Sequence, residues 1–209
     1  DAEGRVTLPG FYEGVADLPE TLRRDWQALD FDARDFLSRV GLSQPIGEKG
    51  RTPLEMVWNR PTAEINGIAG GYAGDGFKTV LPAEARAKVS FRLTGRQDPA
   101  AVREAFRNHV RGFLPADCTV EFHDHGGSPA SVMDTSDPAF AAAKSALSEE
   151  WGREAAFIGA GGSIPVAGDF KHILGMDSLL IGFGRDDDRI HSPNEKYDVE
   201  SFAKGARSW

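Results

Sequence analysis

Apolar residues recur at three- and four-residue spacing in several parts of the chain, which is the pattern of amphipathic helices. This spacing predicts a helix over residues 22–40. Two further helices are expected to begin at Asp98-Pro99 and at Asp137-Pro138, because an aspartate cap followed by proline at the first helical position is a start signal. Shorter periodic runs predict helices over residues 166–174 and 199–209.

Alternating or continuous apolar runs predict the strands. Residues 85–93 alternate small or apolar with polar positions, and residues 55–59 have strand-like composition. The glycine-dense stretch between them, residues 66–76, is expected to be a link that either turns tightly or contacts a ligand. The remaining expected strands are residues 118–122, 157–158 and the buried run 178–183.

The order of these elements gives the fold class. The first part reads strand, strand, helix, strand, which indicates a small α+β layer with an antiparallel sheet. After Gly126-Gly127-Ser128-Pro129 the order becomes α/β. We therefore expect one domain over residues 1–127, loop-rich in residues 1–53, followed by part of an α/β domain over residues 128–209.

Charge and composition narrow the class of protein. The chain of 209 residues has 24 Lys and Arg against 32 Asp and Glu, a net charge of −8 that disfavours nucleic acid as a partner. No apolar run reaches the roughly 18 residues of a membrane span, and no signal-peptide pattern opens the chain. One cysteine, Cys118, fits a reducing cytoplasm. The start at Asp1 without Met suggests a piece of a longer protein.

The first candidate for chemistry is His191, in a loop just after the predicted strand 178–183. Ligands of α/β sheets gather at the carboxyl ends of strands. Asn194 or Glu195 would then orient the imidazole as a metal ligand. The alternative is an ordinary loop histidine that caps a carbonyl group.

The second candidate is the glycine loop of residues 161–165. Its backbone N–H groups suit an anion or a substrate carboxylate. Ser163 also resembles part of a nucleophile elbow, so a serine esterase using Ser163, an aspartate and His191 is an alternative, but Pro165 replaces the last glycine of that pattern. A plain structural turn is the third interpretation.

Two weaker candidates complete the set. His123 and His125 alternate along a predicted strand and would offer two zinc ligands on one face, although histidines at a strand end commonly face water. The run Asp186 to Asp188 lacks the spacing of a calcium loop. We expect that run to be solvated.

Three motifs together resemble the C-terminal portion of the dinuclear-zinc metallopeptidases of family M20, which includes carnosinase-type dipeptidases, carboxypeptidase G, aminoacylase and succinyl-diaminopimelate desuccinylase. Their order and spacing are those of the dipeptidase branch. The motifs are Asn66-Gly67-Ile68 continued by Gly76 to Pro82 and by Ser90 to Leu93, then Gly161 to Pro165, then His191 to Lys196.

The resemblance implies an α/β catalytic domain that holds two zinc ions, with cobalt or manganese as alternatives, and a smaller α+β lid that forms a homodimer. It implies that His191 is the last zinc ligand and that Asn194 and Glu195 hold its loop. The other ligands and the general base of the family would lie upstream of Asp1, so residues 1–209 alone are expected to bind metal weakly and to hydrolyse nothing.

The same resemblance assigns the substrate contacts. Arg92 and Thr79 would bind the backbone and free carboxylate of a dipeptide or N-acyl amino acid, with Thr79 reaching the active site of the partner subunit. Gly162 and Ser163 would hold the other end of the substrate. Ala160 stands where carnosinase-like members often have an acidic residue. A non-enzymatic alternative is a dimerising lid with an assembly role only.

Overall fold

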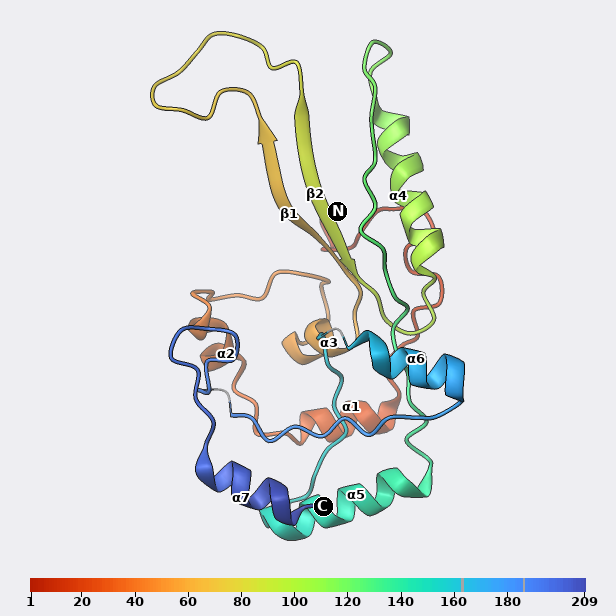
Figure 1. Ribbon diagram of the computed structural model, residues 1–209, viewed down its shortest axis with the longest axis vertical. Coiled ribbons are helices and arrows are strands. Elements are labelled where there is room, and N and C mark those ends of the chain that lie inside the picture. The colour runs from red at the N-terminus through yellow and green to blue at the C-terminus, as the bar shows by residue number, and fades with distance from the viewer. Residues whose placement is uncertain (163, 186) are drawn as a thin grey trace. The chain divides into compact units, whose positions relative to one another are not determined.

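The computed structural model describes residues 1–162, 164–185 and 187–209 (Figure 1). The chain divides into two compact units. Unit 1 contains residues 1–20, 29–131 and the described residues of 159–163, and unit 2 contains residues 21–28, 132–158 and the described residues of 164–209. The elements are α1 (Glu20–Gln27), α2 (Ala33–Arg39), α3 (Pro53–Trp58), β1 (Thr62–Gly70), β2 (Ala85–Arg92), α4 (Pro99–Phe113), α5 (Pro138–Trp151), α6 (Pro165–Leu174) and α7 (Val199–Arg207).

A two-stranded antiparallel sheet forms the long arm of unit 1 (Figure 1). Its register runs from Thr62 opposite Arg92 to Gly70 opposite Ala85, with a bulge between Ile65 and Gly67. The strand expected over residues 85–93 is therefore confirmed as β2. The link expected over residues 66–76 is displaced along the chain, because residues 66–70 belong to β1 and the connection to β2 runs over residues 71–84.

The strand expected over residues 55–59 is wrong, since the structure has helix α3 there. The cause is local. Thr52 Oγ1 accepts a hydrogen bond from the Glu55 N–H, and the Glu55 carboxylate accepts one from the Thr52 N–H. This capping box, followed by Pro53 at the first helical position, starts a helix and outweighs the strand-like composition.

The single helix expected over residues 22–40 is two helices, α1 and α2. Asp32 begins the second, because its carboxylate accepts from the N–H groups of Arg34 at 2.8 Å and Asp35 at 3.1 Å. An aspartate in this capping position has non-helical backbone and stabilises the start of a new helix. The new helix therefore does not continue the preceding one. The periodicity is right for each half and wrong across the junction.

The core of unit 1 is a series of aromatic contacts. Phe11, which is 1% exposed, lies 5.8 Å from Phe91 of β2 between ring centroids. Phe91 contacts Phe106 of α4 at 5.5 Å, and Phe106 contacts Phe122 at 6.4 Å. Residues near the N-terminus thus pack onto the sheet and its helix, which are far from them in sequence.

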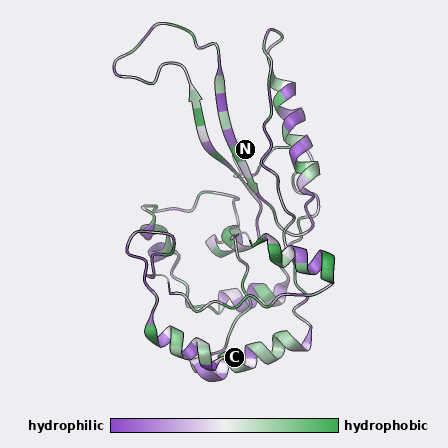
Figure 2. Ribbon diagram, in the orientation of Figure 1, coloured by the Kyte–Doolittle hydropathy of each residue, from purple (hydrophilic) through white to green (hydrophobic). Residues whose placement is uncertain are grey.

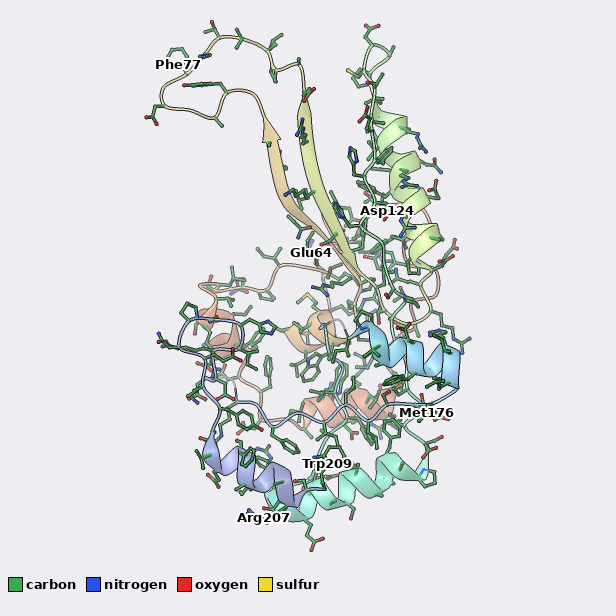
Figure 3. All side chains as sticks on the ribbon, viewed as in Figure 1. Glu64, Phe77, Asp124, Met176, Arg207 and Trp209 are labelled. Atoms are coloured by element: carbon green, nitrogen blue, oxygen red, sulfur yellow. The ribbon has the colours of Figure 1, made fainter. Side chains whose placement is uncertain are left out.

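The strand expected over residues 118–122 is not assigned: those residues join no ladder among the described residues. The segment nevertheless contacts α4 through side chains. Figure 2 shows that hydrophilic and hydrophobic residues alternate along α4. Arg111 lies over the Phe122 ring at 5.2 Å, and Arg103 pairs at 2.9 Å with Asp124. Figure 3 labels Asp124 beside α4. Side-chain contacts rather than a backbone ladder fix it.

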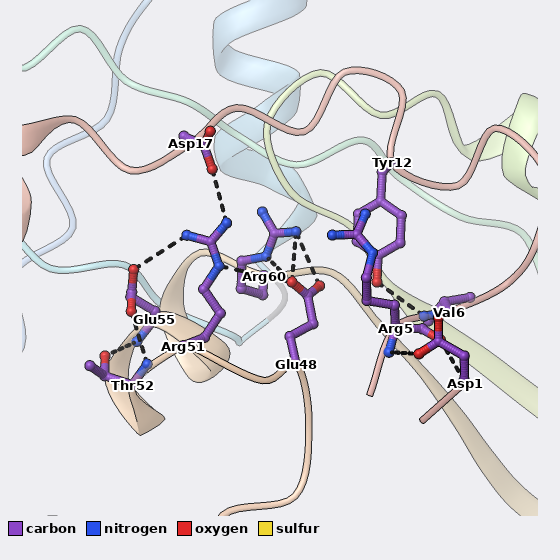
Figure 4. Close-up of polar contacts among 10 residues, drawn as sticks. All are labelled: Asp1, Arg5, Val6, Tyr12, Asp17, Glu48, Arg51, Thr52, Glu55 and Arg60. Atoms are coloured by element: carbon purple, nitrogen blue, oxygen red, sulfur yellow. Dashed lines mark hydrogen bonds and ion pairs between the residues drawn. The ribbon is translucent and has the colours of Figure 1, made fainter. Parts of the chain in front are cut away.

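An ionic cluster, buried at Glu48, Glu55 and Arg60, joins α3 to the segments around it (Figure 4). Arg60 donates two hydrogen bonds to Glu48, at 3.0 Å and 3.1 Å, and both side chains are less than a tenth exposed. Arg51 pairs with Asp17 at 3.0 Å and with Glu55 at 3.5 Å. The parts of the expected loop-rich segment that belong to unit 1, residues 1–20 and 29–53, are therefore held to the rest of that unit by ion pairs as well as by Phe11.

Unit 2 contains the predicted helices α5, α6 and α7, and α7 packs on α5. Trp151 stacks on Phe183 with centroids 5.9 Å apart, and its indole N–H donates to Ser208 Oγ at 3.2 Å. Arg207 pairs with Glu150 at 2.6 Å. These contacts join the last turn of each helix.

The runs expected as strands over residues 157–158 and 178–183 form no ladder within the described residues. Leu180 is 59% exposed, so the second run is not buried as expected. An extended run becomes a strand only beside a hydrogen-bonding neighbour. The mixed α/β class with a small antiparallel sheet is confirmed, whereas the division into domains at residue 127 stays a prediction.

None of the helices in the described ranges has the length and apolar character that crossing a membrane requires.

Candidate functional site: the His191 loop

Asp188 is the centre of the loop that carries His191. Its side chain is 1% exposed, and both carboxylate oxygens accept hydrogen bonds, from Lys196 Nζ at 2.9 Å and from the Arg185 N–H at 2.7 Å. Its backbone carbonyl accepts from the Lys196 N–H at 3.0 Å. The loop of residues 188–196 is therefore closed at its two ends by the same pair of residues.

The ionisation of this pair follows from the contacts. The Arg185 N–H and then the Lys196 ammonium hold the pKa of Asp188 below its usual value. The carboxylates of Asp188 and Asp187 raise the pKa of Lys196. Both groups are charged at neutral pH, so the closure is a charged hydrogen bond.

Between these two ends the backbone is unusual. Arg189, His191 and Asn194 have φ values of 55°, 62° and 62°. Left-handed backbone is uncommon for residues other than glycine and persists where the surroundings enforce it. Two turns lie inside the loop, with the Ser192 N–H donating to the Arg189 carbonyl at 2.9 Å and the Glu195 N–H to the Ser192 carbonyl at 3.2 Å.

The loop brings His191, Asn194 and Glu195 into one short exposed segment. An open hollow of about 530 Å³ lies beside it. The residues that line the hollow are Gly184, Asp188, Ile190, Glu195, Lys196 and Tyr197. The hollow has room for a small ligand next to the predicted site residues.

The base of the loop is tied to α7. Arg185 Nε donates to Ser201 Oγ at 3.2 Å, and Ser201 is fully buried. The Arg185 guanidinium also lies 3.3 Å from the carboxylate of Asp198, which caps α7. Since the Arg185 N–H binds Asp188, the helix and the loop share one anchor.

Thr79 and Arg92 both belong to the β1–β2 hairpin of unit 1 and are exposed. Arg92 lies opposite Thr62 at the base of the hairpin, whereas Thr79 lies in the loop that connects Gly70 to Ala85. Phe77, in the same loop and 87% exposed, marks the tip in Figure 3. The length of β2 separates the two predicted substrate residues, so one hairpin does not bring them together.

The glycine loop passes over the end of α3. A Cβ atom on Gly159 would lie 2.3 Å from the Trp58 carbonyl oxygen, and one on Gly161 would lie 3.1 Å from that of Val57. Gly162 has open space instead. The close approach of the α3 carbonyl groups thus explains why glycine stands at 159 and 161. It does not explain the glycine at 162. Ser163 lies outside the described residues.

The described residues contain no group of three or more His, Cys, Asp or Glu side chains that would hold a metal ion. His123 is 82% exposed and its nearest acidic partner is Glu121 at 3.9 Å. His125 is also exposed. Within the described part of the chain, His191 therefore has too few neighbouring donors for a zinc site.

Sequence reasoning missed Asp188. The solvated run expected over residues 186–188 is wrong at this position, while Asp187 is 72% exposed as expected, and Asp186 lies outside the described residues. Neighbouring aspartates have the same chemistry in a sequence and differ only in burial. The available signal was Lys196 eight residues later, a basic partner at the other end of the loop.

Comparison with known proteins identifies the class. Residues 11–209 match Peptidase family M20/M25/M40, and the chain belongs to this family. The Cys-Gly metallodipeptidase DUG1 of Candida albicans is 30% identical over 213 residues, covering 100% of this chain and 44% of the relative. The Beta-Ala-His dipeptidase of Homo sapiens is 26% identical, with 99% and 41% covered.

Solved structures agree with this assignment. The M20 family metallo-carboxypeptidase Sso-CP2 from Sulfolobus solfataricus matches with a TM-score of 0.84 at 28% identity, covering 100% of this chain and 47% of the other. The di-peptidase Dug1p from Saccharomyces cerevisiae gives 0.75 at 29% identity, covering 100% and 44%. The chain thus spans less than half the length of the relatives it matches.

Proposed function

We propose that this chain is part of a metal-dependent peptidase that hydrolyses a dipeptide or an N-acyl amino acid with a free carboxylate. The observation that carries the proposal is the family match over residues 11–209, together with relatives named as metallodipeptidases. Three motifs in the order and spacing of that family support it. Family membership favours this chemistry over a serine esterase.

His191 serves in this proposal as a ligand of the divalent metal, and Asn194 and Glu195 hold its loop. The exposed position of the ring on a closed loop supports the role. Because the described residues contain no group of three or more His, Cys, Asp or Glu side chains that would hold a metal ion, the proposal takes the remaining ligands from outside the described residues. Zinc is the proposed metal, with cobalt and manganese as alternatives; when bound, it supplies an electrophile and an activated water.

Arg92 is proposed to bind the substrate carboxylate, a task that suits a planar guanidinium. Thr79 lies at the far end of the same hairpin and is proposed to reach the active site of a partner subunit. Gly162 and Ser163 are proposed to hold the other end of the substrate. The open space at Gly162 supports that role.

Two substitutions in the complete protein test these roles. Arg92→Ala is expected to raise KM at least about tenfold with a smaller change in kcat, because it removes a ground-state contact. His191→Ala is expected to lower metal content and kcat together. Metal content is measured by elemental analysis, and the kinetic constants are measured with dipeptides. Small, equal effects of both changes on kcat/KM would refute the assignment.

The isolated chain of residues 1–209 is proposed to be inactive. Purified chain supplied with zinc or manganese should not cleave dipeptides, since a lone histidine cannot complete a zinc site. Cleavage that a chelator abolishes would contradict this proposal and would place the whole ligand set within these residues.

A homodimer through residues 1–127 and a cytoplasmic location complete the proposal. Sizing at several protein concentrations tests the dimer. A dimer without activity in the complete protein would favour the alternative, a lid that acts only in assembly.

A further inference from the structure

Asp188 is held by several hydrogen bonds to Lys196 and Arg185, although the proposed function gives it no role. Its carboxylate, its carbonyl and its N–H are all engaged, the last with the Arg185 carbonyl at 3.1 Å. A carboxylate that is 1% exposed would be costly to bury without such partners. The pair of Asp188 and Lys196 closes a loop of which His191 is near the middle.

The backbone inside this loop needs an external constraint. Left-handed φ values at residues other than glycine are unfavourable and persist where the surrounding structure enforces them. Arg189, His191 and Asn194 all have such values. The internal turns bind Ser192 to Arg189 and Glu195 to Ser192, but they leave both ends of the segment to be fixed by the closing pair.

We propose that Asp188 is a positioning residue that, through Lys196 and the Arg185 N–H, holds the loop of residues 189–195, with its left-handed backbone at Arg189, His191 and Asn194, and so fixes the direction of the His191 imidazole. The connection continues to α7, because Arg185 binds Ser201 and Asp198. The expected effect on catalysis rests on the function proposed for His191, whereas the expected effect on the conformation of the loop does not.

The test compares two isosteric changes in the complete protein. Asp188→Asn removes the buried one of the two carboxylate charges that Lys196 faces and turns one acceptor into a donor. Asp187→Asn is the matched control, since Asp187 also lies 3.1 Å from Lys196 Nζ but is 72% exposed. Lys196→Gln breaks the same closure from a half-exposed side chain and decides the matter if the Asp188 variant does not fold.

Amide hydrogen exchange of Ser192, Glu195 and Lys196, whose N–H groups are hydrogen-bonded within the loop, is expected to become about ten- to a hundredfold faster in Asp188→Asn and in Lys196→Gln, as fits the loss of a charged hydrogen bond. The ring signals of His191 should shift in histidine-labelled protein. Those of His172, whose Nδ1 lies 2.7 Å from the Gly168 carbonyl oxygen in α6, should stay in place.

Unchanged exchange and unchanged His191 signals in both variants would overturn the proposal, as would an equal effect of Asp187→Asn. Kinetics separate it from the proposed function. If the parent protein hydrolyses dipeptides, Asp188→Asn should lower kcat while KM changes by less than about twofold. If the parent protein is inactive while the loop opens as expected, positioning stands and the proposed function fails.

Discussion

At the scale of single residues, buried charge decides which positions tolerate change. The Arg60 guanidinium is 6% exposed and makes two hydrogen bonds to Glu48, whose side chain is 8% exposed (Figure 4). Removal of one partner leaves the other charge in a poorly solvated place. Such a pair contributes little net stability when intact and costs much when broken.

Arg60→Met is therefore expected to lower the free energy of unfolding by about 3 kcal/mol. The lower end of the usual range applies because Arg51 remains 4.0 Å from Glu48. Denaturant titration measures the change. Arg86→Met is the control, because its pair with Glu84 is more than three quarters exposed and is worth at most about 0.5 kcal/mol. Equal losses in both variants would contradict the argument.

Residue chemistry is readable from the sequence only where the pattern is local. Asp98 and Asp137 are predicted as helix caps, and each accepts a hydrogen bond from the N–H two residues later. Glu48 and Arg60 are twelve residues apart, with a helix between them, so nothing in the sequence indicates that they meet. The burial of Asp188 is hidden for the same reason.

At the scale of elements, α7 packs on the ring of Phe183 through a glycine. A Cβ atom on Gly205 would lie 2.7 Å from Phe183 Cδ2, closer than carbon atoms approach. The ring cannot retreat freely, since the indole of Trp151 stacks on it with ring centroids 5.9 Å apart. The close packing of α7 on Phe183, and not a need for backbone freedom, therefore explains the glycine at position 205.

Gly205→Ala is expected to destabilise the protein by about 1–3 kcal/mol, although alanine favours helix by about 1 kcal/mol. Gly112→Ala in α4 is the matched control, because no atom lies within 4 Å of the added methyl group. We expect it to stabilise by about 0.5 kcal/mol. Thermal unfolding of both variants is the measurement, and stabilisation by both would refute the packing argument.

Helices α4 and α5 are predicted to within a residue at their starts, whereas the extended runs 118–122, 157–158 and 178–183 form no ladder within the described residues. α4 and α5 each begin at the proline of an Asp-Pro pair, with the aspartate as the N-cap, so the start signal is local to the sequence. Residues 178–183 have the composition of a buried strand, yet a ladder requires a neighbour that composition does not supply. The candidate site is similar, because the sequence motif identifies the His191 loop but does not identify the pair of Asp188 and Lys196 that closes it.

At the scale of the whole molecule, charge couples the stability of unit 2 to pH. Hydrogen bonds to carboxylates lower the pKa of each of four residues of that unit below the ordinary value. The first partners are Ser136 for Asp134, Arg207 for Glu150, Lys144 for Glu154 and the Arg185 N–H for Asp188. Charged carboxylates thus stabilise the folded unit.

The sign of the pH dependence follows from linkage. Below about pH 4.5 the unfolded chain takes up protons before the folded one, so stability present at neutral pH is lost progressively as pH falls through the folded pKa values. Denaturant titrations should give a constant free energy of unfolding from about pH 7 to pH 5 and a decline below it. Glu150→Gln should make the decline shallower, because its bond to Arg207 no longer titrates.

Amide exchange locates the loss of stability within the molecule. Exchange in α5 and α7 that is faster at about pH 3 than at about pH 6, after correction for the intrinsic rate, would place the loss in unit 2. Equal protection at both pH values would contradict that placement.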